Sequence, residues 1–458
     1  MTFFLNLKIY FYKKLLHIMR KLILVTFVLL FAFLSTGFSQ SLNLRFNNTF
    51  YTWKRLDEVP AAGTSATYTT HLTGYQNLAF DFNFGNKWTL STSVQTDEDV
   101  VKKNGRGFSY RFYDAYLKGS NLFNVLDLKL GRQYVSGGSG RGTIDGAHFK
   151  LKFGERKEYQ IIGFGGYLTP LAYDFEGYNK KLTENFLAGG QFLYYGVKDL
   201  SVGLSYANKQ RAVDPYWTIR PDENFNQKDV LIETESRADQ YGGVDLTYRL
   251  MKKHNLYGRA YYDFNKKKFY KGEFNGIFAL NDKIKFSVGY FYKEPQLSVN
   301  TIFWVFNYLK YQEIQGGLDY STKLLGTDVN IYGRFGGVIY EKDNSLKFQL
   351  GLSGASYGLG ITKYTGYAGE SEGAFAYYNH EILKTKLALT SSINYSRYNL
   401  GNYSSDKTDV FGGTLGLTYR PVSRFSVDAQ GQFMTNEIYK FDTRFLLGIN
   451  YWLFSNFN

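Results

Sequence analysis

The sequence predicts an all-β fold, a single transmembrane antiparallel up-and-down β-barrel of about 22 strands, within a range of 18 to 24. Three observations predict it: apolar and polar residues alternate along most of the chain, aromatic residues reach 19%, and 47 glycines stand against 6 prolines. Successive strand side chains point to opposite faces, and aromatic girdles and tight turns are typical of membrane barrels. The alternative is a soluble antiparallel sheet with one face in a core.

Residues 269–293 show the repeating unit as a hairpin. On the outgoing arm apolar and polar residues have opposite parity, Tyr270, Phe274, Phe278 and Leu280 against Lys271, Glu273 and Asn275. After a polar turn at 281–283, the return arm alternates again, with Ile284, Phe286, Val288, Tyr290 and Tyr292 against Lys285, Ser287, Gly289 and Lys293. Each arm has about ten residues, which as a tilted strand crosses the hydrocarbon of a bilayer.

The N-terminal segment 1–39 has the pattern of a secretory signal peptide. Met19, Arg20 and Lys21 form a positive region, residues 22–34 are largely apolar, and Gly37 and Ser39 suit a cut before Gln40. Met19 is the favoured start of translation, and an extended positive region beginning at residue 1 is the alternative. We therefore expect an exported protein whose barrel occupies residues 40–458.

The same alternation places the expected strands along the chain. They lie near 42–55, 67–84, 88–97, 109–119, 124–135, 144–153, 158–168, 186–197, 200–213, 238–250, 255–266, 269–280, 284–294, 310–323, 328–341, 345–356, 359–369, 374–383, 386–398, 408–420, 424–438 and 443–454. Short connectors such as 85–87 and 281–283 alternate with longer ones at 56–66, 98–108, 170–185, 214–236 and 295–309. Short turns at one end and long loops at the other are typical of outer-membrane barrels. The strands begin directly after the leader, without a plug, so we expect a lumen that is open or narrowed by inward loops.

Strand parity selects the residues that we expect to line the pore. The candidates are Asp114, Lys118, Lys129, Lys150, Arg249, Arg259, Asp263, Lys271, Lys285, Arg334 and Arg444, and the same parity adds Asp127, His148, Lys152, Asp245, Glu273, Glu313 and Asp319. Basic members outnumber acidic ones, and fixed positive charge around a pore favours anions. The alternative is that these charges pair with one another across neighbouring strands.

Residues 112–153 resemble the specific porins, notably the alginate-export type, in the strand pair with Asp114-Ala115-Tyr116-Leu117 and in Leu130-Gly131-Arg132-Gln133 before a Gly/Ser/Arg stretch. The resemblance implies that Arg132 lines the pore. Parity places Arg132 with Leu126, Leu128 and Leu130 on the lipid side. Either a bulge at Gly131 resets the register, or Arg132 lies above the hydrocarbon.

Loops supply further candidates. The run 137–142 is glycine-rich like a phosphate-binding loop, but it joins strand to strand and precedes no helix, so we expect a flexible exterior loop carrying Arg141. Loop 295–309 is apolar at Trp304 and Phe306, which favours an extension of a strand, an inward constriction or a surface that stacks sugar rings. Tyr216 and Trp217 offer a weaker version of the same surface.

The composition narrows the function classes. The chain has no cysteine, its few histidines show no metal-ligand spacing, and no spacing indicates a catalytic site, so we expect neither a cofactor nor an enzyme. The net charge of +14 is dispersed among aromatics, which argues against nucleic acid as a partner. The sequence predicts a bacterial outer-membrane channel, in contact with lipid, for passive diffusion of small hydrophilic solutes, anionic or sugar-like. A structural or adhesive barrel, or the membrane partner of a larger complex, is the alternative, and an outer-membrane enzyme comes third. Whether barrels form a homo-oligomer stays open.

Overall fold

The computed structural model describes residues 40–56, 68–99, 108–170, 181–212, 215–221, 226–232, 239–294, 310–340, 344–366, 370–399, 407–436 and 441–457. These residues form 24 strands. The first half holds β1 (Gln40–Leu56), β2 (Tyr68–Phe84), β3 (Trp88–Asp99), β4 (Ser109–Leu122), β5 (Leu126–Gly137), β6 (Gly140–Phe153), β7 (Tyr159–Leu168), β8 (Asn185–Tyr194), β9 (Leu200–Arg211), β10 (Tyr216–Pro221), β11 (Gln227–Ile232) and β12 (Asp239–Leu250). The second half holds β13 (His254–Asp263), β14 (Lys268–Ala279), β15 (Ile284–Lys293), β16 (Tyr311–Leu324), β17 (Thr327–Tyr340), β18 (Asn344–Gly354), β19 (Tyr357–Gly366), β20 (Glu370–Leu383), β21 (Leu387–Asn399), β22 (Thr408–Val422), β23 (Phe425–Thr435) and β24 (Asp442–Phe457).

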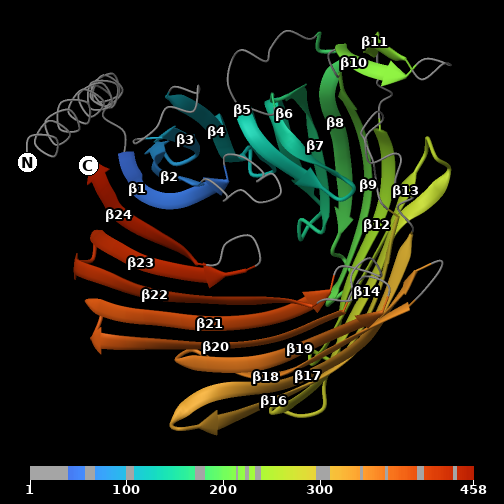
Figure 1. Cartoon of the computed structure of the whole chain (residues 1–458). Coiled ribbons are helices and arrows are strands. Elements are labelled where there is room, and N and C mark those ends of the chain that lie inside the picture. Colours follow the sequence, from blue (N-terminus) through green and yellow to red (C-terminus); the bar gives the residue numbers. More distant parts are fainter. Residues whose placement is uncertain are drawn as a thin grey trace, which may run out of the picture.

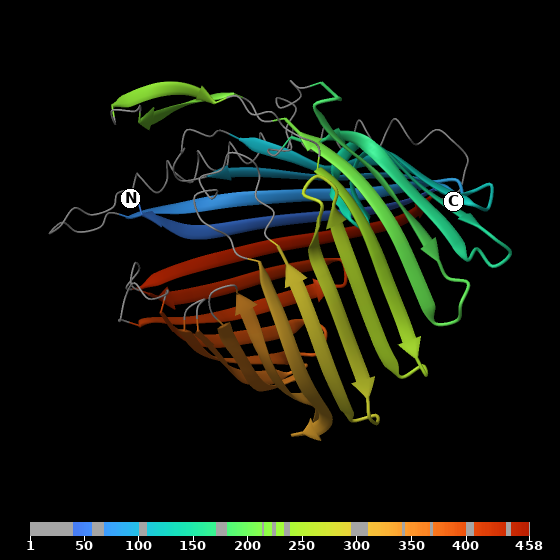
Figure 2. The same cartoon turned by 90° about the vertical axis from the view of Figure 1, so that its right-hand side faces the viewer.

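Twenty-two of these strands form one closed antiparallel barrel, as the alternation predicts (Figure 1). Each strand pairs with its neighbour in sequence, and β1 closes the sheet by pairing with both β2 and β24. The remaining two strands, β10 and β11, form a separate hairpin in the connection between β9 and β12, which pair directly with each other. In Figure 2 this hairpin lies apart from the barrel wall.

The outward face of the wall is apolar and exposed. Large side chains such as Leu204, Phe335 and Leu415 expose 51%, 60% and 58% of their surface. The same face carries Phe274 and Tyr290, which are cross-strand neighbours on β14 and β15. A soluble sheet would bury such a face in a core, so the apolar exterior favours the membrane barrel over the soluble sheet. Among the described residues, no helix is long and apolar enough to span a membrane.

Both ends of the closed sheet lie at the short-turn end of the barrel. Gln40 at the start of β1 pairs with Phe84, next to the turn at 85–87, and with Phe457 near the end of β24. The predicted signal peptide, residues 1–39, and the loop 295–309 with Trp304 and Phe306 lie outside the described residues.

Candidate functional site: the inner face of the barrel

The cross-strand register defines an inner face of the wall. Directly paired residues share a face, so Lys118, Lys129 and His148 line up across β4, β5 and β6, and Asp245, Arg259 and Glu273 across β12, β13 and β14. The exposed apolar residues lie on the opposite face. The polar face is therefore the inner face.

Eleven of the predicted pore-lining residues lie on this inner face, namely Asp114, Lys118, Lys129, Lys150, Arg249, Arg259, Asp263, Lys271, Lys285, Arg334 and Arg444. Asp263 is almost fully buried, and its carboxylate accepts hydrogen bonds from the backbone N–H groups of Asn265 and Lys266 in the turn after β13. It therefore shapes a turn. The role of the other ten in lining a pore stays a prediction.

Several inner-face charges are paired with one another, across adjacent strands, across one intervening strand (Lys347 and Glu313) or along one strand (Lys271 and Glu273). Arg334 lies 2.7 Å from Asp319, Lys347 lies 2.9 Å from Glu313, and Lys152 lies 2.5 Å from Asp127. Glu273 receives both Arg259, at short range, and Lys271 at 3.7 Å. This is the cross-strand pairing that the sequence left as the alternative, and for these residues it applies. Partly exposed pairs of this kind contribute about 0–1 kcal/mol each.

The inner-face charges are unevenly distributed around the described part of the barrel. Strands β4–β18 carry Lys118, Lys129, Lys150, Lys152, Lys209, Arg211, Arg249, Arg259, Lys271, Lys285, Lys293, Arg334 and Lys347, with fewer acids between them. The arc β19–β24 with β1–β3 carries Arg45 and Arg444 against Asp81, Asp97, Asp99, Asp428 and Asp442. Its other inner side chains are mostly Asn, Gln, Ser and Thr. One arc is thus basic and the other neutral to acidic, which gives the interior a field directed across it.

Arg132 departs from the expected pore position. It has the outward parity, paired with Asp145 and Ala115, and no register shift occurs at Gly131. Gly131 has a φ of 120°, and a Cβ there would lie 2.3 Å from the Ala115 carbonyl oxygen, so the backbone is bent without a bulge. Arg132 is 5% exposed and donates to both carboxylate oxygens of Asp145, at 2.9 and 3.1 Å, and to the Phe112 carbonyl. The alternative of a bulge at Gly131 is therefore wrong, and a position of Arg132 above the hydrocarbon stays a prediction.

The buried position of Arg132 follows from the course of the β5–β6 hairpin. Pairing of β5 with β4 ends at Arg132, and pairing of β6 with β7 ends at Ile144, yet the hairpin continues to its turn at 138–139. Beyond this fork the hairpin leaves the wall and crosses the inner side of β7, β8 and β9. Arg132 fills the fork between β4 and β5.

A small apolar cluster holds the hairpin against the wall. Val135 and Ile144 from the hairpin pack with Phe164, Leu168 and Leu187 from β7 and β8, and all five are buried. These β7 and β8 residues are on the inner face, where the rest of the barrel is polar. The cluster gives the hairpin a root, which we define as residues 132–135 and 142–145.

The tip of the hairpin, residues 137–140, reaches strands far from its own. The backbone N–H of Ser139 donates to the Ser205 hydroxyl of β9 at 3.0 Å, and its hydroxyl donates to the Tyr241 carbonyl of β12 at 3.2 Å. Tyr261 of β13 donates to the Gly138 carbonyl at 3.2 Å. A Cβ at Gly138 would lie 2.1 Å from the Ser205 hydroxyl, so glycine permits this close approach.

The structure corrects the expectation of a flexible exterior loop at 137–142. This run is the tip and one arm of an ordered hairpin inside the barrel. Arg141 lies on the hairpin's other surface, exposed, within electrostatic range of Lys209 and Lys271. Its expected role as a constriction residue stays a prediction.

A β-bulge adds a residue that sequence parity assigned to the apolar side. The register shifts between Tyr261 and Tyr262, which leaves Tyr270 as the extra residue of β14. Its ring lies 4.9 Å from that of Tyr241 and 6.1 Å from that of Tyr261, both on the inner face. The predicted outward position of Tyr270 is therefore wrong, because the bulge turns the side chain inward.

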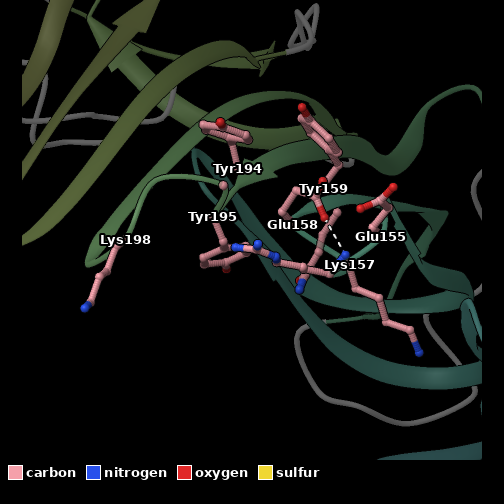
Figure 3. Close-up of a pocket in the computed structure, with 10 residues that line it drawn as sticks. Glu155, Lys157, Glu158, Tyr159, Tyr194, Tyr195 and Lys198 are labelled. Carbon is pink, nitrogen blue, oxygen red and sulfur yellow. Dashed lines mark hydrogen bonds between the residues drawn. The ribbon is translucent and has the colours of Figure 1, made fainter.

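A hollow lies at the short-turn end, between the turns after β6 and β8 (Figure 3). It has a volume of about 760 Å³ and is lined by Glu155, Arg156, Lys157, Glu158, Tyr159, Gln160, Tyr194, Tyr195, Gly196 and Lys198. Glu158 accepts from the Arg156 N–H at 2.9 Å, and Tyr159 stacks on Tyr194 and Phe153 at 5.3 Å. Aromatics beside charged turn residues are typical of the girdle where a barrel meets the membrane surface.

Within the described residues, no group of three or more His, Asp or Glu side chains is arranged to hold a metal ion. No protein-family model matches the chain, and no curated protein matches its sequence. Similar solved structures include OccAB4 of Acinetobacter baumannii, with 9% identity over 91% of this chain and 98% of that chain and a TM-score of 0.43. OpdL of Pseudomonas aeruginosa has 12% identity over 91% of this chain and 99% of that chain, with a TM-score of 0.41. The translocation pore of the P pilus usher PapC has 8% identity over 90% of this chain and 99% of that chain, with a TM-score of 0.43. At these sequence identities and TM-scores, the similarity assigns no function to this chain.

Proposed function

We propose that the protein is a channel of the bacterial outer membrane through which small hydrophilic solutes diffuse without energy or cofactor. The closed barrel with an apolar exterior and a charged inner face is the observation that supports this most. A barrel of 22 strands encloses more space than its own side chains fill, and in outer-membrane barrels such space holds water or a plug. The described part of the chain supplies one inward element, the β5–β6 hairpin, on one side of the interior.

The basic arc of the inner face supports a preference for anionic or sugar-like solutes. Cations on β4–β18 outnumber the acids among them, and this excess lowers the cost for an anion to enter. Paired charges such as Arg334 and Asp319 still present a dipole to the interior. Selectivity then arises from the summed charge of the arc, and no single residue binds the solute.

Purified protein in planar lipid bilayers tests the proposal. We expect stepwise conductance increments in KCl and, in a salt gradient, a reversal potential that indicates anion selectivity. Silence at all voltages, with folding verified by heat-modifiable migration in gels, contradicts a channel. Conductance with cation selectivity keeps the channel and contradicts the role of the basic arc.

The β10–β11 hairpin favours a second candidate, a barrel whose outer surface binds a partner. Trp217 and Ile219 expose 69% and 61% of their surface on one side of this hairpin, and Leu231 lies opposite Trp217 on the same side. The hairpin is outside the 22-stranded sheet, so the barrel does not need it for closure. Silent bilayers combined with binding of labelled protein to intact cells or glycan arrays support this adhesive role.

A further inference from the structure

The β5–β6 hairpin is held unequally along its length. At the root, Arg132 and Asp145 form a two-pronged ion pair and Val135 and Ile144 are buried in the apolar cluster. The amide nitrogen of Gln133 donates to the carbonyl of residue 129 at 3.2 Å and lies 3.4–3.5 Å from those of residues 131 and 146, while its Oε1 is buried with no hydrogen-bond partner in the described part of the chain. Apolar burial and charge-assisted bonds act together here, so the root is firmly attached to the wall.

The tip is attached without an ion pair and without a large apolar side chain of its own. Residues 137–140 are Gly-Gly-Ser-Gly; Ser139 and Gly138 form hydrogen bonds with Ser205, Tyr241 and Tyr261, and the backbone of Gly137 and Gly140 lies against Phe164 and Ala207. A neutral hydrogen bond in contact with water is exchanged for bonds to water at small net cost. Release of the tip loses these bonds and uncovers part of Phe164 and Ala207, whereas release of the root would also break the ion pair and open the apolar cluster.

A buried carboxylate lies under the docked tip and favours its release. The single proton of the Tyr261 hydroxyl is shared between the Gly138 carbonyl, at 3.2 Å, and Oδ1 of Asp245, at 3.1 Å, and Oδ2 of Asp245 is buried with no hydrogen-bond partner in the described part of the chain. The Cβ position of Gly138 is 3.4 Å from that Oδ2. A carboxylate oxygen deprived of hydrogen bonds is destabilising, and lifting the tip would let water reach it.

We propose that the tip is a flap: docked on Ser205 and Tyr261 it lies against the inner side of β9, β12 and β13, and released it moves away from the wall into the lumen and narrows the path through the barrel. This inference rests on the proposed channel function. Ser205 and Tyr261 are positioning residues in it, and the root stays in place during the movement. The flap moves as one turn, because β5 and β6 remain paired with each other up to Gly137 and Gly140.

A disulfide between tip and wall tests the flap directly. The chain has no native cysteine, and the hydroxyl oxygens of Ser139 and Ser205 are 3.4 Å apart, so the double variant Ser139→Cys/Ser205→Cys can form a bond that holds the tip down. In planar bilayers we expect the oxidised protein to show a single high conductance level and the same protein in dithiothreitol to fluctuate between this level and a lower one. Identical records before and after reduction overturn the flap. The control is Ser392→Cys/Thr414→Cys, whose hydroxyls are 2.8 Å apart within the wall and whose bond should change nothing.

A second readout does not need conduction and so separates failure of the flap from failure of the channel. In the single variant Ser139→Cys, a water-soluble maleimide reacts at a rate that reports release of the tip. Adding Tyr261→Phe removes one hydrogen bond and should speed labelling roughly 2- to 13-fold. Tyr257→Phe, on the same strand and face, should leave the rate unchanged. Equal labelling rates in Ser139→Cys alone, with Tyr261→Phe and with Tyr257→Phe overturn the flap. If the rates differ as expected but the protein shows no conductance in bilayers, only the channel function is contradicted.

Discussion

Truncation of Ile144 tests whether the apolar cluster holds the hairpin inside the barrel. Ile144 is fully buried among Val135, Phe164, Leu168 and Leu187. Ile144→Ala removes three carbons, worth about 2.4 kcal/mol at ~0.8 kcal/mol per CH₂, and the cavity that remains adds to this. We expect a total loss of about 2–4 kcal/mol. It should fall mainly on docking of the hairpin, because Ile144 belongs only to the last pair of the β6–β7 ladder, Ile144 with Leu168.

Amide hydrogen exchange of the folded protein in detergent measures this loss locally. A loss of about 2–4 kcal/mol should speed exchange of residues 133–143 roughly 30- to 900-fold, while exchange in β22 stays as in the parent. Ile339→Ala is the control, since Ile339 is already 41% exposed on the outward face and its truncation should leave the hairpin amides unchanged. Unchanged exchange at 133–143, or faster exchange of every strand alike, would refute the idea that the cluster is a local clamp.

Three further predictions concern the wall, the charge and the outer hairpin. Gly131→Ala should destabilise the barrel by about 1–3 kcal/mol in urea unfolding, because alanine disfavours a φ of 120° and its Cβ would meet the Ala115 carbonyl. The control Gly431→Ala should unfold like the parent, since its new Cβ would have no atom within 4 Å. Equal unfolding midpoints for the two variants would contradict backbone strain at Gly131. The double variant Arg259→Gln/Arg334→Gln should shift the reversal potential in a KCl gradient toward cation selectivity. Neutral replacements are chosen because acidic ones would lie next to Glu273 and Asp319. An unchanged reversal potential removes both residues from the ion path. Trp217→Ala with Ile219→Ala should leave conductance as in the parent, since β10 is outside the barrel sheet, and altered conductance would place that hairpin in the solute path.

The positions of the strands were predictable because period-two alternation is a local property. The expected strand at 284–294 corresponds to β15, Ile284–Lys293, and the one at 200–213 to β9, Leu200–Arg211. Inner-face parity held wherever the register was regular, as at Arg259 and Arg334. It failed at Tyr270, since a bulge adds one residue without any mark in the sequence around it. The β10–β11 hairpin was also missed, because its two strands of six residues barely establish an alternation.

The inward course of the β5–β6 hairpin could not be deduced from its own residues. Alternation of apolar and polar residues shows that a hairpin has two different faces. The same alternation is found whether the hairpin continues the barrel wall or folds across its inner side. The Gly/Ser run did predict a strand-to-strand connection, which the structure has as a turn at 138–139 in place of the expected flexible exterior loop. Its location inside the barrel depends on what lies opposite, on strands that are distant in the sequence. Burial of Arg132 follows from this inward course, although its partner Asp145 lies directly opposite it on the other arm of the same hairpin.

A signal for the hairpin is nevertheless present in the strands that it covers. β7 (YQIIGFGGYL) and β8 (NFLAGGQFLY) are apolar or glycine at most positions of both parities, unlike the strands with a charged inner face. A strand that is apolar on both sides must be covered on both sides. Lipid would cover one side of β7 and β8, and in a water-filled barrel the other side needs a protein cover. The β5–β6 hairpin supplies it with Val135 and Ile144. Two-sided apolar strands within an otherwise alternating barrel therefore predict an inward element, and the segment that provides it should itself carry apolar residues beyond the point where it leaves the wall.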